Sequence, residues 1–276
     1  MVKVITFGNF KGGTGKTTNC SLIAYQLANK GYKTLLVDLD PQANATALYL
    51  RTKQRLTNEV VTFDKTLMSA IADNNLSDII INIKENLYLL PSFADFTSYP
   101  LFLEKMFPDS QLDRVTYFNE LLSEIKNDFD FVLIDIPPTL STYTDSALLA
   151  SDYTVIVLQT QERSLVGASA YILYLQELID NYNASFDILG VLPVLTKTTS
   201  KVDESTLELA KEKFGENNLF QNIVKNMERL KRYDITGIVD PDKSVAGKSD
   251  MHDRRVTELY KKVTEEMLDR LKKIES

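Results

Sequence analysis

The feature that most constrains this chain is a glycine-rich loop between a strand and a helix. Residues 3–10, KVITFGNF, are rich in β-branched and aromatic residues, whereas residues 18–31, TNCSLIAYQLANKG, carry apolar residues at helical spacing. Between them, residues 11–18 read KGGTGKTT. This order lets successive backbone N–H groups and the positive end of a helix surround an anion. The segment therefore predicts a phosphate-binding loop in an α/β fold.

The rest of the chain repeats the alternation of strand and helix. Helical patterns occupy residues 112–128, 144–152 and 167–182, and residues 50–86 read only as helices and loops. Further apolar strand candidates are residues 33–40, 86–92, 129–138, 153–161, 188–196 and 219–224. Continuous apolar strands separated by helices predict a mostly parallel sheet with helices on both faces. We expect a single P-loop NTPase-like α/β domain over residues 1–276.

Composition excludes several classes of protein. With 44% hydrophobic and 25% charged residues in 276, the chain is long enough for one large core. No apolar run approaches the roughly 18 residues of a spanning helix, and the N-terminus has no leader pattern, so we expect a cytoplasmic protein. The single cysteine, Cys20, and the single histidine, His252, argue against zinc or iron–sulfur sites. Cys20 is expected to be a packing residue.

The loop residues have separate chemical roles. Gly12, Gly13 and Gly15 allow backbone N–H groups to converge on phosphate, Lys16 can reach the outer phosphates, and the Thr17 hydroxyl can ligate Mg²⁺. The strict pattern G-x-x-x-x-G-K-[ST] fails at its first position, which is Phe10. Lys11 begins the loop and cannot easily serve the same phosphates within its own chain, so by itself it reads as a solvated lysine.

Carboxylates end two of the predicted strands. Asp38 and Asp40 close the strand of residues 33–40, and Asp135 closes that of residues 129–138. The carboxyl ends of neighbouring strands are where an open α/β sheet places its ligands, and Mg²⁺ prefers oxygen donors. Capping or turn roles are the alternative for such residues. We expect the metal set to be Thr17, Asp38, Asp40 and Asp135.

The paired lysines of residues 8–18 resemble the deviant Walker A motif of the ParA/MinD ATPases. The resemblance covers nearly the whole chain and is nearest to short, Soj-like partition proteins. It implies ATP or ADP with Mg²⁺, a switch I at residues 38–46, and a Walker B-like segment with switch II at residues 131–146. It further implies that Lys11 crosses a dimer interface to the partner's nucleotide, that Asp40 orients the attacking water, and that Asp135 holds Mg²⁺ through water. The nucleotide-binding residues implied are Lys11, Gly12, Gly13, Thr14, Gly15, Lys16, Thr17, Thr18 and Asn226.

The family resemblance also implies a function. Short ParA-type proteins are weak ATPases that dimerise on ATP, bind DNA nonspecifically on the nucleoid, and are released when a centromere-binding ParB-like partner stimulates hydrolysis. Because the chain starts at the first strand, we expect no operator-binding domain. Residues 197–276 hold 17 basic and 16 acidic residues, whereas residues 1–196 hold 14 and 22, so we expect any DNA face to be C-terminal. The candidate DNA contacts are Lys225, Arg229, Lys231, Arg232, Lys248, Arg254 and Arg255.

Two other functions stay open at this stage. A MinD-like cell-division ATPase would use an amphipathic C-terminal helix to reach membranes, and residues 253–274 have such a pattern. The acidic residues on its polar face favour packing against the core instead, so we expect no membrane partner. A nucleotide-gated adaptor with negligible hydrolysis is the third reading, against which Asp40 argues.

Overall fold

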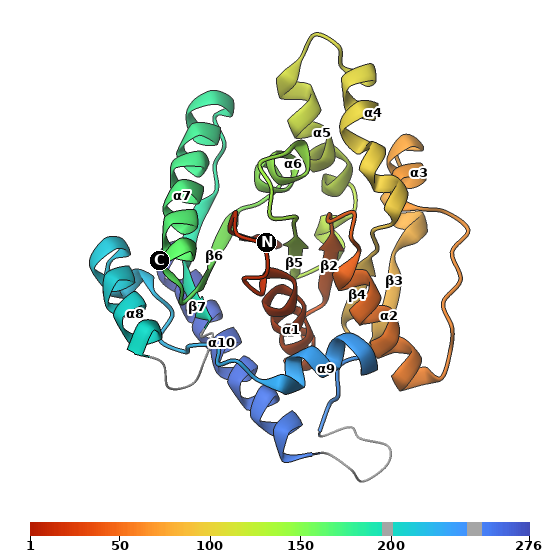
Figure 1. The fold of residues 1–276 in the computed structure, drawn as a ribbon. Helices are drawn as coiled ribbons and strands as arrows, with labels where there is room; N and C mark the ends of the chain where they lie inside the picture. Colours follow the sequence, from red (N-terminus) through yellow and green to blue (C-terminus); the bar gives the residue numbers. More distant parts are fainter. Residues whose placement is uncertain (195–200, 242–249) are drawn as a thin grey trace.

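A seven-stranded sheet forms the centre of the protein (Figure 1). The computed structural model describes residues 1–194, 201–241 and 250–276. The strand order is β3-β4-β2-β5-β1-β6-β7, and every neighbouring pair is parallel except β3 with β4. The strands are β1 Lys3–Gly8, β2 Thr34–Asp38, β3 Ile81–Lys84, β4 Leu87–Leu90, β5 Phe131–Asp135, β6 Tyr153–Gln159 and β7 Asp187–Val194.

Helices cover both faces of this sheet. One face carries α1, α2, α9 and α10, whereas the other carries α3 to α6 over β2, β4 and β5, and α7 with α8 over β6 and β7. The helices are α1 Lys16–Asn29, α2 Asn44–Thr57, α3 Leu67–Ala72, α4 Tyr99–Met106, α5 Gln111–Ser123, α6 Thr142–Leu149, α7 Glu162–Tyr182, α8 Lys201–Phe214, α9 Glu228–Thr236 and α10 Met251–Glu275. Short 3₁₀ turns lie at Leu76–Ile79, Ala94–Ser98, Lys126–Asp128 and Glu216–Asn218.

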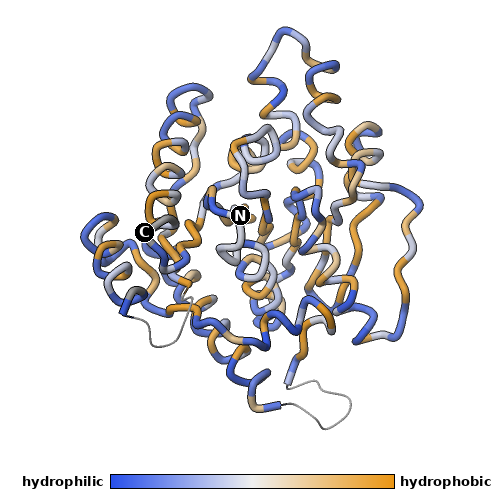
Figure 2. Tube along the Cα trace, viewed as in Figure 1, coloured by the Kyte–Doolittle hydropathy of each residue, from blue (hydrophilic) through white to orange (hydrophobic). Residues whose placement is uncertain are grey.

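The strands supply most of the hydrophobic core. Figure 2 shows apolar stretches along the central strands, whereas apolar and polar residues alternate along the helices. All five residues of β2 and of β5 are buried, as expected for parallel strands covered on both sides. The predicted single α/β domain with a mostly parallel sheet is confirmed.

The C-terminal helix packs on the core. Val256, Tyr260, Val263 and Met267 of α10 are buried in the cluster that also contains α1, whereas Ile274 is exposed. The predicted helix of residues 253–274 is therefore confirmed within two residues at its start, and its apolar face is covered by the protein itself.

Two predictions about strands were wrong. Residues 219–224 form no strand, and their backbone pairs with the sheet through isolated bridges from Leu219 to Val191 and from Val224 to Val194. In contrast, β3 lies within residues 50–86, where only helices and loops were expected. β3 is a strand of four residues at the edge of the sheet, where it pairs only with β4, in the antiparallel direction. Because its other edge has no neighbouring strand, such a strand needs no long apolar run.

The sheet order places the loops of interest together. β1 lies between β5 and β6, and β5 in turn pairs with β2, with Asp38 directly opposite Asp135. The carboxyl ends of these strands therefore meet at one edge of the sheet, where α1 begins. This is the edge at which open α/β sheets bind ligands.

Candidate nucleotide-binding site

The loop between β1 and α1 is built for close approach of an anion. Gly13 and Gly15 adopt left-handed φ values of 72° and 90°, which side-chain-bearing residues rarely accept. Gly15 caps α1 without a side-chain hydrogen bond, so the first N–H groups of the helix point at the loop. Asn19 fixes this geometry by donating from Nδ2 to the carbonyl oxygen of Gly15 at 2.8 Å. The loop thus presents backbone N–H groups and the positive end of a helix to a phosphate.

Lys16 is a buried cation in this loop. It is 6% exposed and stands at the first position of α1. Burial lowers the pKa of its ammonium, and the negative charges of Asp135 and Asp40 partly oppose that change. An ammonium held in this way gains strongly from a nearby phosphate, because few competing water molecules remain around it.

Asp135 carries two buried oxygens without hydrogen bonds. It ends β5, is fully buried, and neither carboxylate oxygen has a hydrogen-bond partner. Burial raises the pKa of Asp135 well above its usual value, with the Asp38 charge acting in the same direction, while the nearby Thr17 hydroxyl and Lys16 oppose it. An unsatisfied buried carboxylate is costly unless something completes it. A hydrated Mg²⁺ beside Thr17 fits this need.

Asp38 and Asp40 differ in how their oxygens are used. Asp38 accepts bonds from Thr46 N–H and the Thr46 hydroxyl, both at 2.8 Å, and from the Asp40 N–H at 3.1 Å. Burial nevertheless raises the pKa of Asp38 to about 6. Asp40 is 7% exposed and accepts one bond, from the Gln42 N–H to Oδ1 at 2.9 Å. This pattern favours Asp38 as a positioning group for the turn and leaves Asp40 able to hold a water molecule.

Lys11 lies against its own protomer. Its ammonium donates to the Gln159 Oε1 at 3.1 Å, to the Gln161 Oε1 at 2.5 Å and to the Ser164 hydroxyl at 2.9 Å. These residues end β6 and begin α7. Lys11 is thus not a solvated surface lysine, and its predicted contact with a partner's nucleotide stays a prediction.

Two cavities meet at the loop. One, of about 550 Å³, is lined by Gly13 to Thr18 together with Asp40, Asn44, Arg51 and Pro138. The other, of about 240 Å³, lies between the loop and the chain before α9, where Val224, Asn226 and Met227 line it with Tyr260. Asn226 lines the second cavity, and its predicted contact with a base stays a prediction.

Sequence reasoning missed Asp234. This α9 residue lines both cavities and therefore lies where they meet. Burial raises the pKa of its carboxyl, and the charge of Arg51 lowers it. No motif marks the position, and in the sequence Asp234 is only one of two acidic residues, with Glu228, inside a basic segment.

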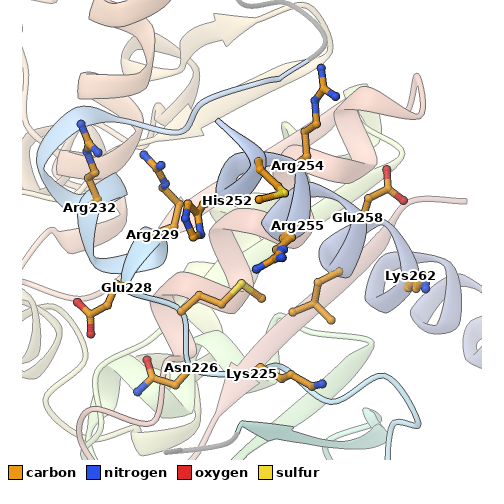
Figure 3. Close-up of a pocket in the computed structure, with 13 residues that line it drawn as sticks. Lys225, Asn226, Glu228, Arg229, Arg232, His252, Arg254, Arg255, Glu258 and Lys262 are labelled. Carbon is orange, nitrogen blue, oxygen red and sulfur yellow. The ribbon is translucent and has the colours of Figure 1, made fainter. Parts of the chain in front are cut away.

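Most of the predicted DNA contacts surround a third hollow. A cavity of about 900 Å³ lies between α9 and α10, with Met227, Met251 and Leu259 among its lining residues (Figure 3). Lys225, Arg232, Arg254 and Arg255 line it as well and are exposed. Figure 3 shows Arg232 and Arg254 extending away from their helices. Lys231 is exposed on α9 and pairs with Glu228 at 3.0 Å, whereas Lys248 lies outside the described residues.

Arg229 differs from the other candidate contacts. Its side chain is 11% exposed and pairs with Asp250 and with Asp253, whose own side chain is 3% exposed. The Arg229 Nε lies 3.3 Å from the Asp253 Oδ1. Arg229 therefore joins α9 to α10 inside the protein, and little of it is available to a phosphate backbone.

The fold and the loop define a P-loop nucleotide-binding protein. Comparison with known proteins narrows this class, because the AAA_31 family model, described as an AAA domain, matches residues 2–188. The chromosome-partitioning ATPase Soj of Treponema pallidum is 29% identical over 230 residues, which is 83% of this chain and 85% of that one. The virulence plasmid ParA family protein pGP5-D of Chlamydia psittaci is 32% identical over 198 residues, covering 69% and 68%.

Solved structures share the fold of this chain. McdA of Cyanothece in its apo form superposes with a TM-score of 0.78 at 22% identity, covering 98% of this chain and all of that one. An ATP complex of a McdA variant superposes with a TM-score of 0.76 at 21% identity, covering 98% and 96%. The chain belongs to the ParA/Soj family of deviant Walker A ATPases. Among its described helices, none has both the length and the apolar composition needed to span a bilayer.

Proposed function

We propose that this protein is a DNA partition ATPase that dimerises on ATP, binds DNA nonspecifically as a dimer, and leaves it after partner-stimulated hydrolysis. The observation that carries the proposal is one loop that presents two lysines in different directions. Lys16 is buried beside Asp40 and Asp135, whereas Lys11 lies on the opposite side against β6 and α7. These directions support a role for Lys16 at the protomer's own phosphates and a role for Lys11 at the nucleotide of a second subunit.

The donors around Asp135 support Mg²⁺ as the metal. The described part of the chain holds no group of three or more His, Cys, Asp or Glu side chains arranged to bind an ion unaided. The Thr17 hydroxyl and Asp135 would therefore hold Mg²⁺ together with phosphate oxygens and water. Bound there, Mg²⁺ would neutralise charge on the outer phosphates.

The chain's own residues would carry the remaining steps. Gly13 and Gly15 orient backbone N–H groups, Lys16 stabilises charge on the transferred phosphoryl group, and Asp40 orients the attacking water. Asp38 holds the turn that carries Asp40 through its bonds to Thr46 and to the Asp40 N–H. Because Lys11 is held by oxygens of its own protomer, we expect slow turnover until a ParB-like partner acts.

Exposed cations on α9 and α10 support the DNA-binding part of the proposal. Each phosphate contact adds to affinity whatever the base sequence, so a dimer with two such faces binds more tightly than one protomer. ATP would thereby control residence on the nucleoid, within the cytoplasm. A membrane role is disfavoured because the apolar face of α10 is already buried against the core.

Sedimentation with ADP and with ATP tests the proposal. Lys16→Ala should abolish ATP binding, whereas Lys11→Ala should bind ATP and stay monomeric. An undiminished ATP dimer in Lys11→Ala would refute the role of Lys11 across the interface. Retention on nonspecific duplex and on anionic vesicles, each with either nucleotide, separates DNA binding from a membrane function or from a DNA-independent adaptor.

A further inference from the structure

The resting position of Lys11 is a built site. We define the Lys11 cradle as Gln159, Gln161 and Ser164, whose oxygens accept bonds from the Lys11 ammonium at 3.1, 2.5 and 2.9 Å. Ser164 is fully buried, and Gln161 is half-buried at the start of α7. Each of these three oxygens can take one of the three donors of the ammonium, which a chance surface contact would rarely achieve.

The backbone of the loop is fixed at the same place. The Asn9 side chain accepts from the Lys11 N–H and donates to the Val157 carbonyl, both at 2.9 Å. Phe10 packs edge-on against Tyr171 and Tyr174 of α7, with ring centroids 5.0 and 5.2 Å apart. The start of the loop is therefore fastened to β6 and α7, and moving Lys11 into a second subunit's site means releasing its side chain from the cradle.

The strength of these bonds suits a reversible hold. The three cradle acceptors are uncharged, so each bond to Lys11 is weaker than one to a phosphate oxygen. A triphosphate in a facing subunit can therefore outcompete the cradle, while a neutral surface cannot. Only a released Lys11 can reach the nucleotide of the second subunit. The apparent affinity of the dimer is therefore lower when a larger fraction of protomers still holds Lys11 in the cradle.

We propose that the Lys11 cradle keeps the lysine in its own protomer at rest and thereby sets the protein concentration at which the ATP dimer forms. Gln159, Gln161 and Ser164 are thus positioning residues for Lys11. This inference rests on the proposed function, since it assumes that Lys11 acts across a dimer. Its first half, the hold on Lys11 within one protomer, can be measured without any dimer.

Opposite substitutions at Gln161 provide the test. Gln161→Leu removes one acceptor at similar volume, and Gln161→Glu replaces it with a charged one that is also favourable at a helix N-terminus. In the nucleotide-free protein, the rate at which an acylating reagent labels the Lys11 amine should rise in the first variant and fall in the second. Labelling of exposed Lys213 on α8 serves as the internal reference.

Formation of the ATP dimer should also change in opposite directions in the two variants, becoming easier in Gln161→Leu and harder in Gln161→Glu. One lost bond to an ammonium corresponds to roughly tenfold per protomer, so Gln161→Leu should lower the dissociation constant of the ATP dimer on the order of 100-fold. Gln161→Glu should raise it. A merely structural role for Gln161 would weaken the dimer in both variants, so the opposite signs separate the two explanations.

Each result has a definite meaning. Unchanged Lys11 labelling in both variants overturns the cradle, even if the wild type dimerises normally. Changed labelling with an unchanged dimer constant overturns its control of dimerisation. A wild type that binds ATP and never dimerises overturns the proposed function and this control together. Labelling and dimer constants that both move as stated support the inference.

Discussion

Asp38 and Thr46 share two hydrogen bonds, because the backbone N–H and the hydroxyl of Thr46 both donate to the same Asp38 oxygen at 2.8 Å. The Thr46 hydroxyl also accepts from the Ser92 N–H at 2.9 Å. A single threonine thereby links the end of β2, the first turn of α2 and the chain after β4. We expect this link to hold the turn that carries Asp40.

Thr46→Val should therefore destabilise the protein by about 2–3 kcal/mol, since it leaves a buried carboxylate oxygen and a buried N–H each short of a partner. Thr46→Ser keeps the hydroxyl and should cost about 1 kcal/mol or less. Urea unfolding of both variants measures the difference. Equal losses in the two variants would show that the hydroxyl is unimportant.

Ala43→Gly should stabilise the protein. Ala43 caps α2 with a left-handed φ of 53°, where an L side chain costs about 1–2 kcal/mol. Glycine removes that strain and loses about 0.5–1 kcal/mol through the entropy of the unfolded chain, so we expect a net gain of about 0.5–1 kcal/mol. The urea midpoint should rise, whereas Ala47→Gly within α2 should lower it. A lower midpoint for Ala43→Gly would contradict this account.

Gly237→Ala should be strongly destabilising. A Cβ at Gly237 would lie 2.7 Å from the Thr52 backbone nitrogen and 2.8 Å from the Arg51 carbonyl, and its φ is 75°. Because backbone atoms cannot easily move aside, we expect a loss of about 3 kcal/mol or more. Gly31→Ala is the matched control, since its φ is also positive and no atom lies within 4 Å. Thermal unfolding should show a much smaller loss there, of about 1–2 kcal/mol.

Arg229 and Arg232 should separate stability from DNA binding. Arg229→Gln leaves the buried Asp253 without its cation and should cost about 2–3 kcal/mol in chemical unfolding. Arg232→Gln should change the free energy of unfolding by less than about 0.5 kcal/mol and weaken binding to nonspecific duplex. The slope of the logarithm of the binding constant against the logarithm of the salt concentration should decrease in magnitude by about 1. If the DNA affinity falls in a folded Arg229→Gln variant and is unchanged in Arg232→Gln, Arg232 does not belong to the DNA-binding face.

Asp40→Asn should leave an ATP dimer that does not turn over. Asparagine retains an oxygen that can accept from the Gln42 N–H, so the turn persists while the carboxylate that orients water is lost. We expect phosphate release to fall on the order of 100-fold, with ATP binding unchanged. Phosphate release in the presence of DNA and partner measures the first, and sedimentation the second. Normal turnover would remove Asp40 from the mechanism.

The sequence predicted those parts of the fold and site that depend on local order along the chain. The strand, loop and helix around Lys16 were predicted because glycine spacing and apolar periodicity act over a few residues. Asp135 was singled out because it lies at the end of a buried strand. The sheet edge at β3 was missed because four residues with one buried side chain resemble a loop.

The contacts that could not be predicted join distant segments. Asp234 enters the site because α9 crosses both cavities, and Arg229 is internal because α10 brings Asp253 beside it. Both residues belonged to one charged segment in the sequence, and only tertiary packing separates them. The hold on Lys11 likewise spans about 150 positions of chain, from residue 11 to residues 159–164.

The bond from the Tyr260 hydroxyl to the Asn19 Oδ1, at 3.0 Å, spans 241 positions of the chain. At about 5–20 residues per second, a ribosome needs on the order of 10–50 s to add the tyrosine after the asparagine. Throughout that interval, the cavity of about 240 Å³ between the loop and the chain before α9 lacks Tyr260, which lines it in the complete protein. A nascent chain, or a product truncated before α10, thus has an unfinished nucleotide site, and translation itself delays the moment at which the protein can respond to ATP.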